Sequence, residues 1–253
     1  MIALLTPIFQ GEWRQYGESL VHSPTIPTDA IQVSQLIQVP ALLKHLVQLH
    51  AKKWETEDLR PAASAWSCSY LDALLPAVAT AASLLQHFFP ASADDIAVRF
   101  NHQAQDGTTK DFHIRSLGTS LAGNNTLKRY DALLNNHLAP LFEQLHQQCG
   151  VAKKILWGNV ARYLDNLFRE AGDLVKGTPA ASILRQDREE LLCHPQWSDG
   201  RTNPLYTRRR DVQITRNGCT ESLTLHRQCC LYYLLPGEGY CGGCPLDPVY
   251  RKL

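Results

Sequence analysis

The chain has 253 residues, 44% of them hydrophobic, so it is long enough to bury one large core. Its 25 Lys and Arg nearly balance its 24 Asp and Glu, which excludes the basic excess typical of nucleic-acid-binding proteins. The longest apolar stretch, 71–89, is interrupted by Asp72, Pro76 and other polar residues, so we expect no transmembrane segment. The N-terminus lacks the basic and apolar regions of a signal peptide, and we expect a cytoplasmic protein.

The first third of the sequence predicts helices. Residues 1–27 contain three prolines and are expected to be irregular. Apolar periodicity then predicts a helix over 28–49 that is interrupted at Pro40. A longer Ala- and Leu-rich stretch predicts a helix over 65–89, with Pro76 as a kink or a break.

The middle of the chain predicts one hairpin and two long helices. Alternating residues at 96–100 and 111–115 flank an Asp-Gly pair, which is typical of a β-hairpin. Periodic apolar residues predict helices over 126–148 and 153–171, and Gly150 separates the two.

The last third predicts a shorter helix over 179–192 and a turn-rich segment over 195–206. A second hairpin is expected from 211–215 and 223–226, which flank Arg-Asn-Gly, and its last strand runs directly into Cys229.

These elements together predict an α+β fold. It consists of a mainly helical body with two small β-hairpins and a C-terminal loop that carries a cluster of cysteines. We divide the chain into a body, residues 1–205, and a C-terminal tail of hairpin and loop, residues 206–253.

Four of the eight cysteines lie in the last 25 residues. They form the pattern Cys229-Cys230, ten residues, Cys241-Gly-Gly-Cys244. In a cytoplasmic protein, where thiols stay reduced, cysteines at this spacing predict a metal centre rather than disulfides. On residue type and spacing alone, structural zinc and an iron–sulfur cluster are equally good interpretations.

The geometry of the two cysteine pairs adds a constraint. Neighbouring residues of a strand point to opposite faces, so Cys229 and Cys230 reach one centre only if the chain bends there. A [2Fe–2S] cluster accepts ligands from more directions than a single zinc ion does. The Gly242-Gly243 spacer allows left-handed backbone conformations and brings amide N–H groups towards sulfur.

The cysteine pattern resembles that of the FhuF-like ferric-siderophore iron reductases. The resemblance continues in Arg227-Gln-Cys-Cys-Leu-Tyr-Tyr-Leu-Leu-Pro, and upstream in Ile155-Leu-Trp-Gly-Asn159 and Asn203-Pro-Leu205. It covers mainly residues 150–247. It implies that the loop binds a [2Fe–2S] cluster through Cys229, Cys230, Cys241 and Cys244.

The resemblance also implies a function. The chain would be an oxidoreductase that reduces Fe(III) in a siderophore, of hydroxamate type, by one electron, and so releases Fe(II) for iron assimilation. The body would be the siderophore platform. We find no dinucleotide-binding or phosphate-binding glycine motif, so the electron would come from a ferredoxin or flavoprotein partner. A zinc-stapled interaction protein and an iron–sulfur sensor remain the alternatives.

Several residues outside the cysteine pattern are candidates for substrate or donor contacts. Trp157, Asn159 and Tyr163 are candidate platform residues, although Trp157 follows the apolar spacing of a core face. A basic run precedes the cluster and is a candidate docking site for an acidic donor: Arg208, Arg209 and Arg210, with Arg216 and Arg227 further along the hairpin. The other four cysteines, Cys68, Cys149, Cys193 and Cys219, have no ligand spacing, and we expect them to leave the metal unaffected.

Overall fold

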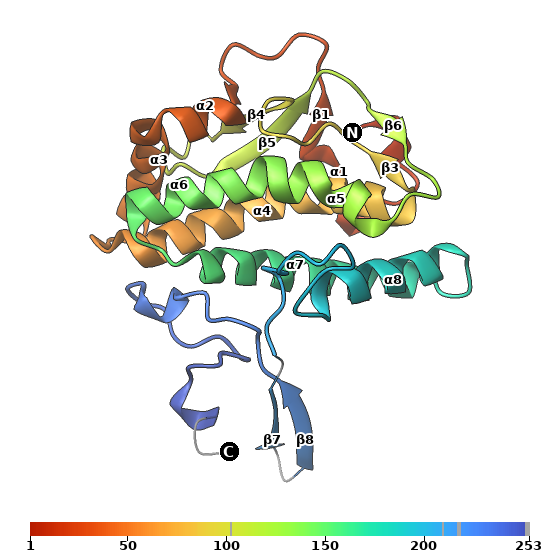
Figure 1. Cartoon of the computed structure of the whole chain (residues 1–253). Helices are drawn as coiled ribbons and strands as arrows, with labels where there is room; N and C mark the ends of the chain where they lie inside the picture. The colour runs from red at the N-terminus through yellow and green to blue at the C-terminus, as the bar shows by residue number, and fades with distance from the viewer. Residues whose placement is uncertain (102, 209, 217–218, 251–253) are drawn as a thin grey trace.

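The computed structural model describes residues 1–101, 103–208, 210–216 and 219–250. Within them the chain is mainly helical with three small sheets, which confirms the predicted α+β class. All the described α-helices belong to the body (Figure 1). Their bounds are α1 Arg14–Glu18, α2 Val33–Gln38, α3 Pro40–Lys53, α4 Leu59–Leu84, α5 Thr126–Leu133, α6 Ala139–Cys149, α7 Lys153–Leu174 and α8 Ala180–Leu192.

Helix α4 is the central element of the body. Asp58 caps it by accepting a hydrogen bond from the Arg60 amide, and its small Ala and Ser side chains let α3, α7, α8 and β5 approach closely. The helix continues through Pro76, where a kink or break was predicted, because burial of almost its whole length offsets one lost backbone hydrogen bond. None of the helices in the described part of the chain is both long enough and apolar enough to cross a membrane.

The first predicted hairpin forms the centre of a larger sheet. Strands β4, Ile96–Phe100, and β5, Thr109–Ile114, pair antiparallel as predicted. The sheet has the order β1-β5-β4-β2, so two short strands that the sequence did not predict, Leu20–His22 and Ile31–Gln32, form its edges. Strand β1 pairs parallel with β5, more than 80 residues further along the chain. A further pair, β3 and β6, joins His87–Phe88 to Thr119–Ser120.

Helices α7 and α8 cover the face of α4 that is turned away from the large sheet (Figure 1). A buried polar network locks α8 in place. The carboxylate of Asp187, which is fully buried, accepts hydrogen bonds from Thr126 at 2.6 Å, from Ser83 at 2.7 Å and from the guanidinium of Arg129. These partners come from α4 and α5, so one charge ties three helices together.

The tail lies below α7 in Figure 1, and its hairpin points away from the body. Strands β7, Asp211–Arg216, and β8, Cys219–Thr224, pair antiparallel, which confirms the second hairpin. Strand β8 ends at Thr224, so the prediction that the strand runs into Cys229 is wrong; four residues of irregular chain intervene. The tail has a small apolar core of its own, formed by Val212, Ile214, Leu225 and Tyr250.

Candidate metal centre

The four tail cysteines meet in two pairs beneath α7. The Cys229 and Cys244 sulfurs lie 3.8 Å apart, and the Cys230 and Cys241 side chains are in hydrogen-bonding contact. Cys229, Cys230 and Cys244 are buried, and Cys241 is partly exposed. The structure therefore brings together all four cysteines that the sequence selected.

The chain bends sharply just after Cys229-Cys230, as two adjacent ligands require. Leu231 has φ +63°, a left-handed conformation that is rare for a leucine, and a short 3₁₀ turn, Tyr232–Leu234, follows. The Leu231 amide donates to the Cys229 sulfur at 3.3 Å. The bend that the sequence argument demanded is therefore present, and it supplies an N–H···S contact.

The Cys241–Cys244 turn shows how its glycines are used. Neither Gly242 nor Gly243 is among the described residues with positive φ, so the left-handed conformation that these glycines allow is not used here. The turn closes instead through a hydrogen bond from the Cys244 amide to the Cys241 carbonyl at 2.9 Å. Gly243 packs against the His226 ring, and a Cβ atom there would lie 3.4 Å from it. The glycine therefore serves close packing.

Buried hydrogen bonds fasten the cysteine loop to the body. Ser64 of α4 donates to the Cys230 carbonyl at 2.7 Å. The Asn159 amide of α7 donates in turn to Ser64 Oγ at 3.1 Å and to Ser67 Oγ at 3.0 Å. This chain of polar contacts fixes the position of Cys230 relative to both helices.

Helix α7 also contacts the loop directly. Arg162 donates from Nη2 to the Gln228 carbonyl at 3.0 Å, and its guanidinium contacts the Cys230 sulfur. One turn earlier, Gly158 lies so close to Gln228 that an added Cβ would approach the Gln228 Cβ to 2.5 Å. A side chain larger than hydrogen at residue 158 would therefore push the loop away from the helix.

The thiols of the metal-free chain have shifted pKa values. The hydrogen bond from Cys241 lowers the pKa of Cys230 to about 5, and the nearby Arg162 guanidinium acts in the same direction. The same hydrogen bond raises the pKa of Cys241. Burial raises the pKa of Cys229 to about 11. Thiolate is the form that binds metal, so metal binding at this site releases protons from the thiols whose pKa is raised, Cys229 and Cys241.

The arrangement in pairs fits a two-iron cluster. Two thiolates on one tetrahedral metal, each with a bond of about 2.3 Å, lie about 3.8 Å apart, which is the Cys229–Cys244 distance. Among the described residues no group of three or more His, Cys, Asp or Glu is placed to hold a single ion. Two separate pairs suit a [2Fe–2S] cluster, in which each iron takes two protein ligands.

The three predicted platform residues occupy different environments. Trp157 is 8% exposed and packs edge to face on Phe142, and Asn159 is 1% exposed within the network described above. Tyr163 is partly exposed, and burial raises its pKa. The structure thus places two of the three inside the body, and contact of all three with a substrate stays a prediction.

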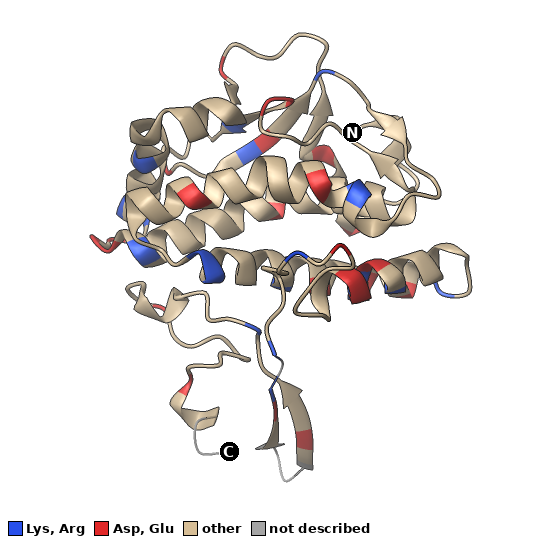
Figure 2. Cartoon of the chain, in the orientation of Figure 1, with Lys and Arg blue, Asp and Glu red and all other residues tan. Residues whose placement is uncertain are grey.

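Figure 2 shows basic residues where the chain passes from the body to the tail hairpin. Arg208 is exposed, Arg210 donates to the Tyr250 carbonyl at 2.9 Å, and Arg227 donates to the Thr207 carbonyl at 3.1 Å. Arg209 and the Arg216 side chain lie outside what the structure describes. Donor docking at these arginines stays a prediction.

Cys68 lies close to the cluster loop. It follows Ser64 by one turn of α4 and interacts electrostatically with Arg162 and Cys230, while burial raises its pKa. Burial also raises the pKa of Cys149, to about 11, and that of Cys193. The Cys219 side chain lies outside what the structure describes.

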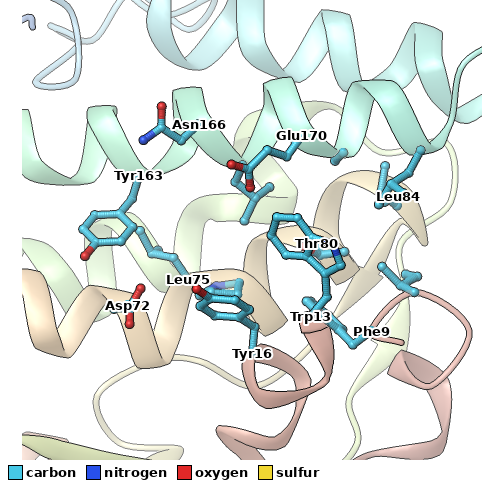
Figure 3. A pocket seen from close by; sticks show the side chains of 15 residues that line it. Phe9, Trp13, Tyr16, Asp72, Leu75, Thr80, Leu84, Tyr163, Asn166 and Glu170 are labelled. Atoms are coloured by element: carbon cyan, nitrogen blue, oxygen red, sulfur yellow. The ribbon is translucent and has the colours of Figure 1, made fainter. Parts of the chain in front are cut away.

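Two hollows flank α7. One, of about 270 Å³, is mainly apolar and lies between α7, α4 and the N-terminal segment. Figure 3 shows Tyr163 and Asp72 at one end of this apolar pocket and Leu84 at the other, with Trp13 and Tyr16 between them. The second, of about 410 Å³, lies on the cluster side of α7 and is lined largely by arginines.

The sequence matches two related family descriptions. Residues 64–218 match "Ferric iron reductase FhuF-like transporter", and residues 227–246 match "FhuF 2Fe-2S C-terminal domain". The chain belongs to the FhuF-like family. The second match spans all four tail cysteines, so the cofactor of this FhuF-like chain is a [2Fe–2S] cluster.

Individual proteins resemble parts of the chain. It is 27% identical over 118 residues to the ferric siderophore reductase of Escherichia coli strain K12. That match covers 47% of this chain and 40% of the relative, so the chain spans about two fifths of the relative's length. The fold resembles aerobactin synthetase IucA from Klebsiella pneumoniae, with a TM-score of 0.52 and 17% identity over 70% of this chain and 38% of that one. At that identity the likeness shows a shared fold alone.

Sequence reasoning missed the residues that hold the cluster loop on the body. Ser64, Arg162 and Gly158 each lie 66 or more residues from their partner in the loop. Of these three, only Gly158 lies in a segment with a family signal, Ile155–Asn159. The structure explains that segment, because Gly158 admits Gln228 and Asn159 supports Ser64.

Proposed function

We propose that this chain is a ferric-siderophore reductase that reduces Fe(III) in a siderophore complex by one electron. The observation that carries the proposal is that the four tail cysteines lie in two close pairs, within a segment that matches a [2Fe–2S] domain. A hydroxamate siderophore holds Fe(III) through hard oxygen atoms and holds Fe(II) far more weakly. Reduction therefore loosens the complex and releases Fe(II) for assimilation.

We propose Cys229, Cys230, Cys241 and Cys244 as the cluster ligands, with Cys229 and Cys244 on one iron and Cys230 and Cys241 on the other. A bound [2Fe–2S] cluster supplies one electron at a time. Arg162 and the Leu231 amide provide positive charge and N–H donors at the sulfurs, which favours the more negative, reduced state. No side chain need donate a proton for this transfer.

The electron donor in this proposal is a ferredoxin or flavoprotein. We expect it to dock on a surface of this chain that includes Arg208, which is exposed. Charge reversal by Arg208→Glu should slow reduction of the cluster by an acidic donor, and the effect should shrink as salt rises. Arg185→Glu, at an exposed position on α8, is the matched control. Equal slowing at all salt concentrations would show that Arg208 does not act by docking.

The reductase function can be tested anaerobically in a single turnover. The cluster is reduced, a ferric hydroxamate siderophore is added, and the visible spectrum is followed. We expect reoxidation in proportion to the Fe(III) added, with Fe(II) trapped by a chelator. A cluster that ferricyanide reoxidises but that no ferric siderophore reoxidises would contradict the reductase function and favour the sensor.

A further inference from the structure

The arginine-lined hollow on the cluster side of α7 has a distinctive composition. It lies between α7, the side of α8 and residues 224–227, which lead from the hairpin to the first cysteine pair. We call it the arginine cleft. Its charged and titratable residues are Arg162, Arg169, Arg188, Arg227, Asp165 and His226.

Positive charge is in excess in the arginine cleft. Asp165 is the only carboxylate among its lining residues, and it pairs with Arg188 at 2.8 Å. Arg162 donates to the Gln228 carbonyl and also contacts the Cys230 sulfur. Arg169 donates to the side-chain oxygen of Asn166, and Arg227 donates to the Thr207 carbonyl.

The cleft adjoins the proposed cluster site. Arg162 is a wall of the cleft and also touches Cys230. His226, another lining residue, donates its backbone N–H to the Gly243 carbonyl at 2.7 Å, within the Cys241–Cys244 turn. Arg162 and His226 therefore each line the cleft and contact the cysteine loop, so a molecule bound in the cleft would lie next to that loop.

The apolar pocket on the other side of α7 has the opposite character. Its charged lining residues are Asp72 and Glu170, both acidic, and most of its surface is aromatic or aliphatic. It cannot attract an anion. The two hollows share Asn166 on α7, so one helix separates an anion-attracting side from an anion-repelling side.

We propose that the arginine cleft binds the ferric substrate through carboxylate groups, so that the preferred substrates are anionic ferric hydroxamates that carry free carboxylates. This inference rests on the proposed reductase function. Guanidinium groups bind carboxylates in bidentate fashion, which both attracts and orients the complex. The volume of about 410 Å³ lies in the range of small-molecule pockets, about 300–1,000 Å³. A donor protein needs a broader surface, about 800 Å² per partner.

The test uses matched probes that differ only in charge. The first is the neutral tris complex of acetohydroxamate, and the second is the tris complex of a hydroxamate that carries a free carboxylate. Gallium(III) forms of both, which accept no electron, are titrated into the cluster-loaded protein by calorimetry. We expect the anionic gallium complex to bind at least tenfold more tightly than the neutral one.

The variant Arg169→Glu places a negative charge in the cleft without touching the cysteines. We expect it to reduce the preference for the anionic complex about tenfold, and Arg185→Glu on the exposed face of α8 to leave the preference unchanged. If Arg169→Glu does not fold, Arg169→Gln, which only removes the charge, should lower the preference less but in the same direction. Visible spectra of the variants check that the cluster is intact.

Three outcomes would overturn the inference. They are no charge preference in the unmodified protein, an unchanged preference in Arg169→Glu, and slower reduction by the donor in that variant with chelate binding unaffected. The last would assign the cleft to the donor. Reoxidation by the two iron(III) complexes is measured in parallel. If the gallium complexes bind as expected while neither iron complex reoxidises the cluster, the reductase function fails and the anion site stands.

Discussion

The body and the tail are held together by different means. The body packs eight helices and a four-stranded sheet around one continuous apolar core and satisfies even its buried charges internally, as at Asp187. The apolar core seen in the described part of the tail has four buried residues: Val212, Ile214, Leu225 and Tyr250. The tail's other buried side chains include Cys229, Cys230 and Cys244. A segment with so little apolar surface needs a metal centre or a neighbour to become ordered.

The difference explains how one chain can bind a cofactor on a rigid support. The body contributes fixed contacts to the cluster loop, from Ser64 to the Cys230 carbonyl and from Arg162 to the Gln228 carbonyl. The tail contributes the thiols. Loss of the cofactor should therefore affect the two regions unequally, and the following predictions test that inequality from the largest effect to the smallest.

Removal of the cluster should give the largest effect, and it should be confined to the tail. We expect amides of residues 219–250 to lose most of their protection from hydrogen exchange in the metal-free protein, while α4 and α7 keep theirs. Hydrogen exchange with mass spectrometry, compared between loaded and metal-free protein, measures this. Loss of protection throughout the body would show that the metal centre is part of the main core.

The body should depend instead on its buried charge. Asp187→Asn leaves the Arg129 guanidinium buried without its counter-charge, which should cost about 3–5 kcal/mol of the free energy of unfolding. Asp199→Asn removes a similar pairing with Arg201 at the surface and should have little effect. Urea unfolding measures both. Equal effects of the two substitutions would contradict the structural role of the buried network.

Acid should weaken the body through His137. Burial lowers the pKa of this imidazole to about 4, whereas in the unfolded chain the histidine takes up its proton near its ordinary pKa of 6.5. The contribution of His137 to the free energy of unfolding should therefore be fully present above pH 6.5 and should be lost as the pH falls towards 4. The loss should be about 3 kcal/mol, at about 1.4 kcal/mol per pKa unit. The free energy of unfolding of His137→Gln, measured over the same pH range, should not show this decrease. An NMR titration of His137 with a midpoint near 6.5 would contradict the prediction.

The smallest effect should come from loosening the contact between the two regions. Gly158→Ala places a methyl group against Gln228 and should destabilise docking of the loop by about 1–3 kcal/mol. Gly172→Ala, on the same helix, meets its nearest neighbour at an ordinary 3.8 Å and is the control. Exchange rates of the amides around Gln228 report the effect. Identical rates in the two variants would mean that the close approach at Gly158 is not needed.

Local signals in the sequence predicted much of this structure. Apolar periodicity located the helices that became α5 to α8, and the Asp-Gly pair located the hairpin of β4 and β5. The cysteine spacing selected four thiols that the fold brings together. Each of these features depends on residues close to one another in the chain.

Features that depend on distant partners could not be predicted. Strand β1 is defined by its pairing with β5, which no local pattern encodes. Pro76 signals a break, and the burial of most residues of α4 overrides it. Tyr250, which lies outside the cysteine pattern, packs in the tail core and donates to the Gly242 carbonyl at 2.9 Å. The contacts of Ser64 and Arg162 likewise follow from tertiary packing.

The central claim is that the four tail cysteines hold the [2Fe–2S] cluster. Iron, acid-labile sulfide and zinc are measured in the anaerobically purified protein and in five variants: Cys229→Ser, Cys230→Ser, Cys241→Ser, Cys244→Ser and Cys68→Ser. We expect about two irons and two sulfides per chain, absent or much reduced in the first four variants and retained in Cys68→Ser. Stoichiometric zinc without iron, or loss of the cluster in Cys68→Ser alone, would contradict the claim.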